Sequence, residues 1–191
     1  MNRAFPLAIV AASICAVSMP AWTFDASNIV SGSGTIEFAF TPGDDAAGLL
    51  VRAIDAARSQ VLVQAFSFTH EQVANALTRA RRRGVDVQVL VDPEQTELID
   101  HNVVGRLVEG KVPVFADGAH SAAHNKIVLI DAGTGQPVLV TGSFNFTFAA
   151  QYRNAENMLV IRGNRELAHA YLENWERHRA HSVPFNAGTA H

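Results

Sequence analysis

The sequence predicts an α/β protein: a single domain in which helices cover both faces of a mixed, largely parallel sheet. In its first half, short apolar runs typical of buried strands alternate with segments whose apolar residues recur at helical spacing. In the second half, a hairpin-length connection at 132–137 indicates an antiparallel pair. With 191 residues, 48% of them apolar and 17% charged, the chain is long enough to bury one full core.

The first half reads as strands followed by helices. A Ser-Gly segment precedes an alternating strand, and Asp44 and Asp45 then open a helical run, as expected because acidic groups favour helix N-termini. The expected strands are 35–40, 61–66, 85–91 and 112–115. The expected helices are 45–59, one through 73–80 that stops at Gly84, and a weaker one at 98–109.

The second half changes rhythm. Its expected elements are strands 126–131, 138–141 and 157–161 and a last helix at 165–181. Tyr171 and Trp175 fall on the apolar face of that helix. We therefore interpret both as core residues rather than ligand-binding ones.

The first 21 residues differ from the rest. Arg3 precedes an uncharged, Ala-rich stretch through Ala21, the layout of a signal peptide (1–21) cleaved somewhere within 18–21. The expected catalytic domain is 34–184, in the periplasm or secreted. An uncleaved anchor is the alternative, although about 18 residues is short for a membrane span. Cys15, the single cysteine, lies in this segment, so the mature chain would have no disulfide or thiolate site.

Overall charge does not indicate a nucleic-acid binder, since 15 Lys and Arg against 18 Asp and Glu give a net charge of −3. Any phosphate site must therefore be local. Only Lys111 and Lys126 are lysines, whereas the other cationic side chains are arginines.

His124 and Lys126 are the first candidate site residues. Residues two apart on a strand share a face, so the imidazole and the ammonium are expected side by side. Burying such a pair on an apolar strand is costly unless it serves a ligand. Two neighbouring cationic groups favour an anion.

Ser143 and Asn145 repeat this spacing after the next strand, where Gly142 permits close approach of the backbone. Asn145 is also expected to cap a short helix at 146–150. Alone, the two residues would be an ordinary turn and cap. With Lys126, they can surround several oxygens at once, which favours phosphate over a carboxylate.

Two acids complete the candidate set. Asp131 lies seven residues after His124, on the opposite face of a regular strand, so we expect it to fix the turn before Gly133 through its own backbone bonds. Glu156 opens an apolar strand. It can accept a hydrogen bond from His124 Nδ1 and leave Nε2 free for attack, although strand-edge solubility is a competing explanation.

These residues resemble the signature of the phospholipase D superfamily, His-x-Lys-x4-Asp followed by Gly-Ser-x-Asn. The matching residues are His124, Lys126, Asp131, Gly142, Ser143 and Asn145. The gap from Asp131 to Gly142 is a few residues longer than usual, which the turn at 133–137 can absorb. Within the superfamily the chain is similar to small bacterial Nuc-type endonucleases, from about Thr35 to the last helix.

The resemblance implies a phosphohistidine mechanism and a homodimer. His124 would attack phosphorus in line, and water would later resolve the covalent intermediate. A second imidazole must protonate the leaving oxygen, yet no other histidine has a lysine two residues on. Two copies of His124, Lys126 and Asn145 are therefore expected to face each other across a two-fold axis.

The scheme requires no metal or other cofactor. The spacings of His120 with His124 and of His178 with His181 are those of zinc-binding pairs. However, the first pair leads into a strand, and we assign no acidic third ligand to it. No metal site is predicted.

The expected activity is that of an exported, metal-independent endonuclease with a nucleic-acid substrate, DNA or RNA, and little sequence preference. One alternative is a phospholipase D acting on membrane lipids, which a retained N-terminal anchor would favour. The other is an exported module that binds nucleic acid or another anion with an idle His124. Intact His124, Lys126, Asn145 and Glu156 argue against that module.

Overall fold

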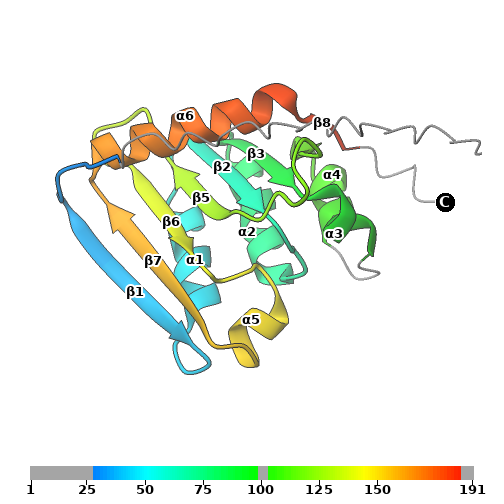
Figure 1. Cartoon of the computed structure of the whole chain (residues 1–191), viewed down its shortest axis with the longest axis horizontal. Helices are drawn as coiled ribbons and strands as arrows, with labels where there is room; N and C mark the ends of the chain where they lie inside the picture. The colour runs from blue at the N-terminus through cyan, green and yellow to red at the C-terminus, as the bar shows by residue number, and fades with distance from the viewer. Residues whose placement is uncertain (1–27, 99–102, 186–191) are drawn as a thin grey trace, which may run out of the picture.

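The computed structural model describes residues 28–98 and 103–185. Their strands form one 8-stranded sheet in the order β1-β7-β6-β5-β2-β3-β4-β8, with β1 at one edge and β8 at the other (Figure 1). The segment interpreted as a signal peptide lies outside the described residues. Within them, no helix combines the length and the apolar character needed to cross a membrane.

The elements follow the predicted order. The strands are β1 (Thr35–Thr41), β2 (Gln60–Ala65), β3 (Asp86–Val91), β4 (Val114–Ala116), β5 (Lys126–Ile130), β6 (Val138–Gly142), β7 (Glu156–Arg162) and β8 (Val183–Pro184). The helices are α1 (Ala46–Asp55), α2 (Glu71–Arg82), α3 (Pro93–Leu98), α4 (Val104–Glu109), α5 (Phe148–Tyr152) and α6 (Arg165–His181).

The sheet is mixed, but the expectation that it is largely parallel is wrong. Of the neighbouring pairs, only β2–β3 and β3–β4 are parallel, and the other five are antiparallel. β1 does run in the same direction as β2, as a strand–helix–strand pattern requires. The hairpin strands β5 and β6, together with β7, insert between β1 and β2 and convert those contacts into antiparallel ones.

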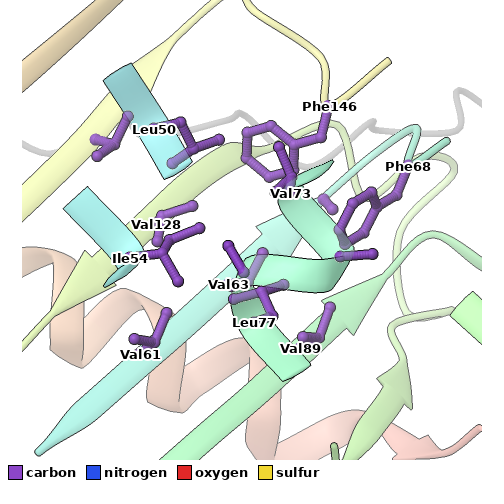
Figure 2. Packing of buried hydrophobic residues seen from close by; sticks show 14 of the residues in the cluster. Leu50, Ile54, Val61, Val63, Phe68, Val73, Leu77, Val89, Val128 and Phe146 are labelled. Carbon is purple, nitrogen blue, oxygen red and sulfur yellow. The ribbon is translucent and has the colours of Figure 1, made fainter. Parts of the chain in front are cut away.

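Helices cover both faces, as predicted. α1 begins at Asp45, whose carboxylate accepts from Gly48 N at 2.8 Å, and buries Leu50 and Ile54 against the sheet. These side chains pack with Val61 and Val63 of β2 and with residues of α2, as Figure 2 shows. β2 is buried on both faces, which explains its continuous apolar sequence.

α6 covers the opposite face. Trp175 is buried there, and its Nε1 donates to Val63 O at 3.2 Å, so its predicted core role is confirmed. Tyr171 is only partly buried and lies at the border of a cavity. The interpretation of Tyr171 as a core residue is therefore only partly correct.

The predicted helix at 98–109 is replaced by two short helices, α3 and α4. α3 begins earlier because Pro93 suits the first helical position and Asp92 Oδ1 accepts from Gln95 N at 2.8 Å. Residues 99–102 lie outside the described part of the chain.

Candidate active site

The candidate site lies at one end of the sheet, where the ends of three inner strands meet. Because β5, β6 and β7 are antiparallel neighbours, the start of β5, the end of β6 and the start of β7 lie together. These ends border a cavity of about 520 Å³. Its lining residues are His124, Asn125, Lys126, Ile127, Thr141, Gly142, Ser143, Asn145, Glu156 and Tyr171.

His124 and Lys126 are in direct contact, as their spacing suggested. Lys126 Nζ lies 3.1 Å from His124 Nδ1 and donates to His124 O at 2.8 Å. An ammonium group has no lone pair, so in this arrangement Nδ1 is the acceptor. The lysine is buried whereas the histidine is exposed.

The aromatic ring of Phe66 supports both groups. Its centroid lies 4.3 Å from that of the His124 ring and 4.6 Å from Lys126 Nζ. Burial lowers the pKa of Lys126, and the negative charge of Glu156 opposes this effect. An ammonium held in such surroundings gains more from an anionic ligand than one in open water.

Glu156 binds different partners from the one predicted. Its Oε2 accepts from Ser143 Oγ at 2.5 Å, and its Oε1 accepts from Asn154 Nδ2 at 3.1 Å. The expected hydrogen bond to His124 Nδ1 is not formed, because Lys126 Nζ occupies that position. Glu156 instead fixes the loop after β6 to the start of β7.

The hydroxyl of Ser143 is already engaged. It donates to Glu156 and accepts from Asn157 N at 3.0 Å. In this arrangement the hydroxyl proton is not directed at a phosphate, so the predicted phosphate contact of Ser143 requires a rotation away from Glu156.

At Gly142 the backbones of β6 and β7 lie unusually close together. The φ of Gly142 is +151°, and a Cβ at this position would lie 2.3 Å from Asn157 O. Only glycine fits this close approach, because any side chain would collide with the backbone of β7. The same carbonyl oxygen accepts from Ser143 N and Phe144 N at 3.1 and 3.2 Å.

Asn145 does not cap the following helix. The short helix α5 begins at Phe148, and its cap is Thr147, whose hydroxyl accepts from Ala150 N at 3.1 Å. Asn145 Oδ1 is buried and makes no hydrogen bond within the described residues. A buried oxygen without a donor is costly, typically by about 1–3 kcal/mol. A phosphate offers only acceptor oxygens, so Asn145 would bind it through its amide nitrogen, Nδ2, and not through Oδ1.

Asp131 lies away from the cavity and serves the fold. Its carboxylate accepts from Arg58 N, Ser59 N and Gln60 N at 3.0, 2.7 and 2.9 Å, and from Ser59 Oγ at 2.8 Å. Its backbone has a φ of +52° and its carbonyl accepts from Thr134 N. The residue thus ties both the turn after β5 and the loop before β2, a second connection that the sequence did not indicate.

We expect Asp131→Asn to lower the free energy of unfolding at pH 7 by about 2–4 kcal/mol, because a buried charged acceptor of several hydrogen bonds is lost. Burial alone would raise the pKa of Asp131, but the hydrogen bonds from residues 58–60 hold it below the ordinary 3.8. Its contribution is therefore fully present above that value and declines as the pH falls through the lower folded-state pKa.

Urea unfolding at several pH values tests this expectation. The difference between the wild type and Asp131→Asn should be full at pH 7 and shrink below pH 3.8. Glu176→Gln, an exposed acid on α6, is the control and should leave stability unchanged. A difference that stays constant with pH would contradict an ionised Asp131 as its source.

Sequence reasoning missed two residues of this site. From the sequence, Phe66 was identified only as the last residue of a buried strand. An aromatic residue at the end of a strand expected next to His124 and Lys126 could have suggested that it contacts them. Tyr171 carried no signal, because its helical periodicity is that of a core residue.

Comparison with known proteins places this geometry in a family. The family model described as "Cardiolipin synthase, PLD-like domain" matches residues 50–179, a range that includes every residue predicted for the site. The chain belongs to the phospholipase D superfamily. The resemblance read from the sequence is thereby confirmed, and this superfamily member is a hydrolase that acts on phosphodiester bonds.

Related sequences carry several names. A protein named phospholipase D from Rickettsia felis is 36% identical over 141 residues, which span 74% of this chain and 68% of the relative. The human protein named mitochondrial cardiolipin hydrolase is 32% identical over 135 residues, or 71% of this chain and 51% of that protein.

Two solved structures share the fold. Nuc from Salmonella typhimurium, described as a phospholipase D family member, superposes with a TM-score of 0.75 at 28% identity, covering 81% of this chain and 100% of Nuc. NucT from Helicobacter pylori superposes with a TM-score of 0.72 at 22% identity, covering 80% of this chain and 100% of NucT, and shows likeness of fold.

Proposed function

We propose that this superfamily member is an exported, metal-independent endonuclease that cleaves DNA, or RNA, with little sequence preference. The observation that carries the proposal is the contact between a buried Lys126 ammonium and an exposed His124 imidazole at the wall of a polar cavity. These groups can bind the phosphate of a phosphodiester but make no base-specific contact, so little sequence preference is expected.

The surroundings of the site favour nucleic acid over lipid. On α5, just beyond Asn145, the exposed rings of Phe148 and Tyr152 lie 4.4 Å apart, and Arg153 Cζ lies 5.7 Å from the Phe148 centroid. Exposed aromatic rings beside a cation suit stacking on bases and contact with the phosphate backbone. The likeness to Nuc over the whole of that chain supports the same choice.

The chemistry follows from the positions of the groups. Attack requires the tautomer of His124 that carries its proton on Nδ1, so the Lys126 ammonium must turn from that nitrogen to the phosphate. The lone pair of Nε2 then attacks phosphorus, a nitrogen–phosphorus bond forms, and the bond from phosphorus to the leaving oxygen breaks. Lys126 and Asn145 stabilise the charge on the non-bridging oxygens. His124 of a second copy protonates the leaving oxygen, then takes a proton from the water that hydrolyses the phosphohistidine.

An apolar strip beside the cavity supports the dimer that this scheme needs. Ile36, Phe38 and Phe40 of β1 are 63%, 62% and 58% exposed. Phe38 pairs with Leu159 of β7, which pairs with Thr141 at the cavity, so the strip lies on the face of the sheet that carries Thr141 and Ile127 of the cavity wall. Lys126, one residue before Ile127, falls on the alternate face of β5. We propose that a second copy of the chain covers this strip, since the chemistry requires a second imidazole at the same place.

A phospholipase is the second candidate. The Rickettsia relatives named phospholipase D favour it, and the same apolar strip would suit contact with a membrane. The catalytic steps would be unchanged, because lipid headgroups are also joined by phosphodiester bonds.

A parallel assay tests the proposal. The purified mature protein is offered plasmid DNA, single-stranded RNA and phosphatidylcholine vesicles in excess chelator, well below its unfolding temperature under those conditions. We expect the nucleic acids to be cleaved and the lipid to remain intact. Hydrolysis of phosphatidylcholine alone would favour the phospholipase, and a protein that binds plasmid without cleaving it would be the binding module.

A further inference from the structure

We propose that Asp117, His120, His178 and His181 form a binding site for zinc or a similar divalent transition metal, separate from the catalytic residues. Each of the four offers a ligand atom, and these atoms all lie within 4.8 Å of one another. The residues come from two distant parts of the chain: the loop that follows β4 and the last turns of α6.

A buried carboxylate organises the cluster. Asp117 is 1% exposed, and its two oxygens face different imidazoles. Oδ2 lies 2.6 Å from His178 Nδ1, and Oδ1 lies 2.9 Å from His181 Nε2. One carboxylate thus holds a ring nitrogen of each histidine at hydrogen-bond distance, which keeps both nitrogens close to a common centre.

The three imidazole rings are arranged as they are around a metal. Their centroids are 5.1 Å apart for His120 and His178, 5.4 Å for His120 and His181, and 5.5 Å for His178 and His181. Three imidazoles bound tetrahedrally to zinc have ring centres about 5 Å apart, given the length of a zinc–nitrogen bond. Hydrogen bonds to Asp117 account for the positions of the His178 and His181 rings, whereas His120 joins them without a hydrogen bond to that carboxylate in the described part of the chain.

The donor set suits a closed, structural site. Three imidazoles and one carboxylate supply the four ligands of a tetrahedral zinc site. Nitrogen ligands favour zinc over calcium or magnesium, which prefer oxygen.

Sequence spacing suggested two separate pairs, His120 with His124 and His178 with His181, although Asp117 lies only three residues before His120. The fold instead brings Asp117 and His120 to the last turns of α6, at the end of the sheet where β8 lies (Figure 1). The earlier reason for excluding a metal, the lack of an acidic third ligand, is therefore wrong.

A metal at this position would join the loop that leads into His124 to the end of α6. The loop has few other anchors among the described residues, one being the hydrogen bond from Ala123 N to Asp92 Oδ2 at 2.8 Å. The metal would act as a crosslink that stabilises the fold and takes no part in the reaction. Its presence is compatible with hydrolysis in chelator at moderate temperature.

The test is zinc binding by the full chain, purified without a histidine tag. Equilibrium dialysis should give one zinc per chain, and Co²⁺ in its place should show the visible bands of tetrahedral coordination. Zinc at about 100 times its dissociation constant should raise the thermal midpoint by about 5–10 °C. These readouts do not depend on nuclease activity, so the metal site and the proposed function can fail separately.

His120→Ala is the decisive variant, because His120 is exposed and its loss leaves the buried Asp117 bonds in place. We expect zinc affinity to fall at least tenfold and the thermal shift to disappear. His169→Ala, an exposed histidine on α6, is the matched control and should bind zinc as the wild type does. Absence of stoichiometric zinc, unchanged binding by His120→Ala, or loss of zinc only in His124→Ala would overturn the proposal.

Discussion

Replacement of His124 by alanine is expected to lower phosphodiester turnover by about 10⁴-fold or more, because the nucleophile is removed. The fold should remain, since the side chain is exposed and its contacts are limited to Phe66 and Lys126. Initial rates on the preferred substrate and the thermal midpoint measure the two effects. His169→Ala controls for loss of a surface histidine. Activity within about tenfold of the wild type would remove His124 from the nucleophile's role.

The same variant tests the shared site. Wild-type protein quenched during turnover should carry acid-labile, alkali-stable phosphate on His124, and the variant should carry none. When wild-type and inactive subunits are mixed in equal amounts and allowed to exchange, only about a quarter of the dimers contain two histidines. Activity should therefore fall to about a quarter if both imidazoles are required, and to about half if each subunit works alone.

Replacement of Lys126 by methionine is expected to reduce kcat/KM by about 10²–10³-fold, the cost typical of losing one charged group that stabilises the transition state. Methionine keeps the length of the side chain and packs well against the Phe66 ring, so the buried position should stay filled. The substitution removes the ammonium from His124 Nδ1 as well as from the phosphate.

The chain offers a matched control for this experiment. Lys111 is the only other lysine, and it is exposed in the turn before β4. Lys111→Met should leave kcat/KM and the thermal midpoint near those of the wild type. If the two variants had equal activity, Lys126 would not be the cation that holds the phosphate.

The positions of the strands, and the face of each strand that is buried, could largely be predicted from the sequence. Which strands pair with each other in the sheet could not. Apolar alternation shows which face of a strand is buried, a local property. The pairing of β1 with β7 joins residues near opposite ends of the chain, and no local pattern encodes it. For this reason the predicted strands exist, while most of the pairs turned out antiparallel.

The site shows the same division. The spacing of His124 and Lys126 was sufficient to place them side by side, because both belong to one strand end. The choice of partner for Glu156 was not predictable, because it depends on contacts between different parts of the chain. Lys126 of β5 occupies His124 Nδ1, and Ser143, which follows β6, donates to Glu156 at the start of β7. Likewise, Thr147 rather than Asn145 caps α5, a competition between two good caps that spacing alone does not decide.

The edge position of β1 also constrains the order in which the molecule can assemble. β1 leaves the ribosome early, yet its sole neighbour in the sheet, β7, is made only after nearly all the other strands. Until then, the backbone of β1 has no hydrogen-bonding partner in the sheet, and the strand also carries Phe38 and Phe40, which stay exposed in the folded chain. An unpaired strand with such side chains is prone to aggregation. Completion of this edge of the sheet therefore waits until β7 has been made, and a nascent chain of this protein needs protection along its first strand.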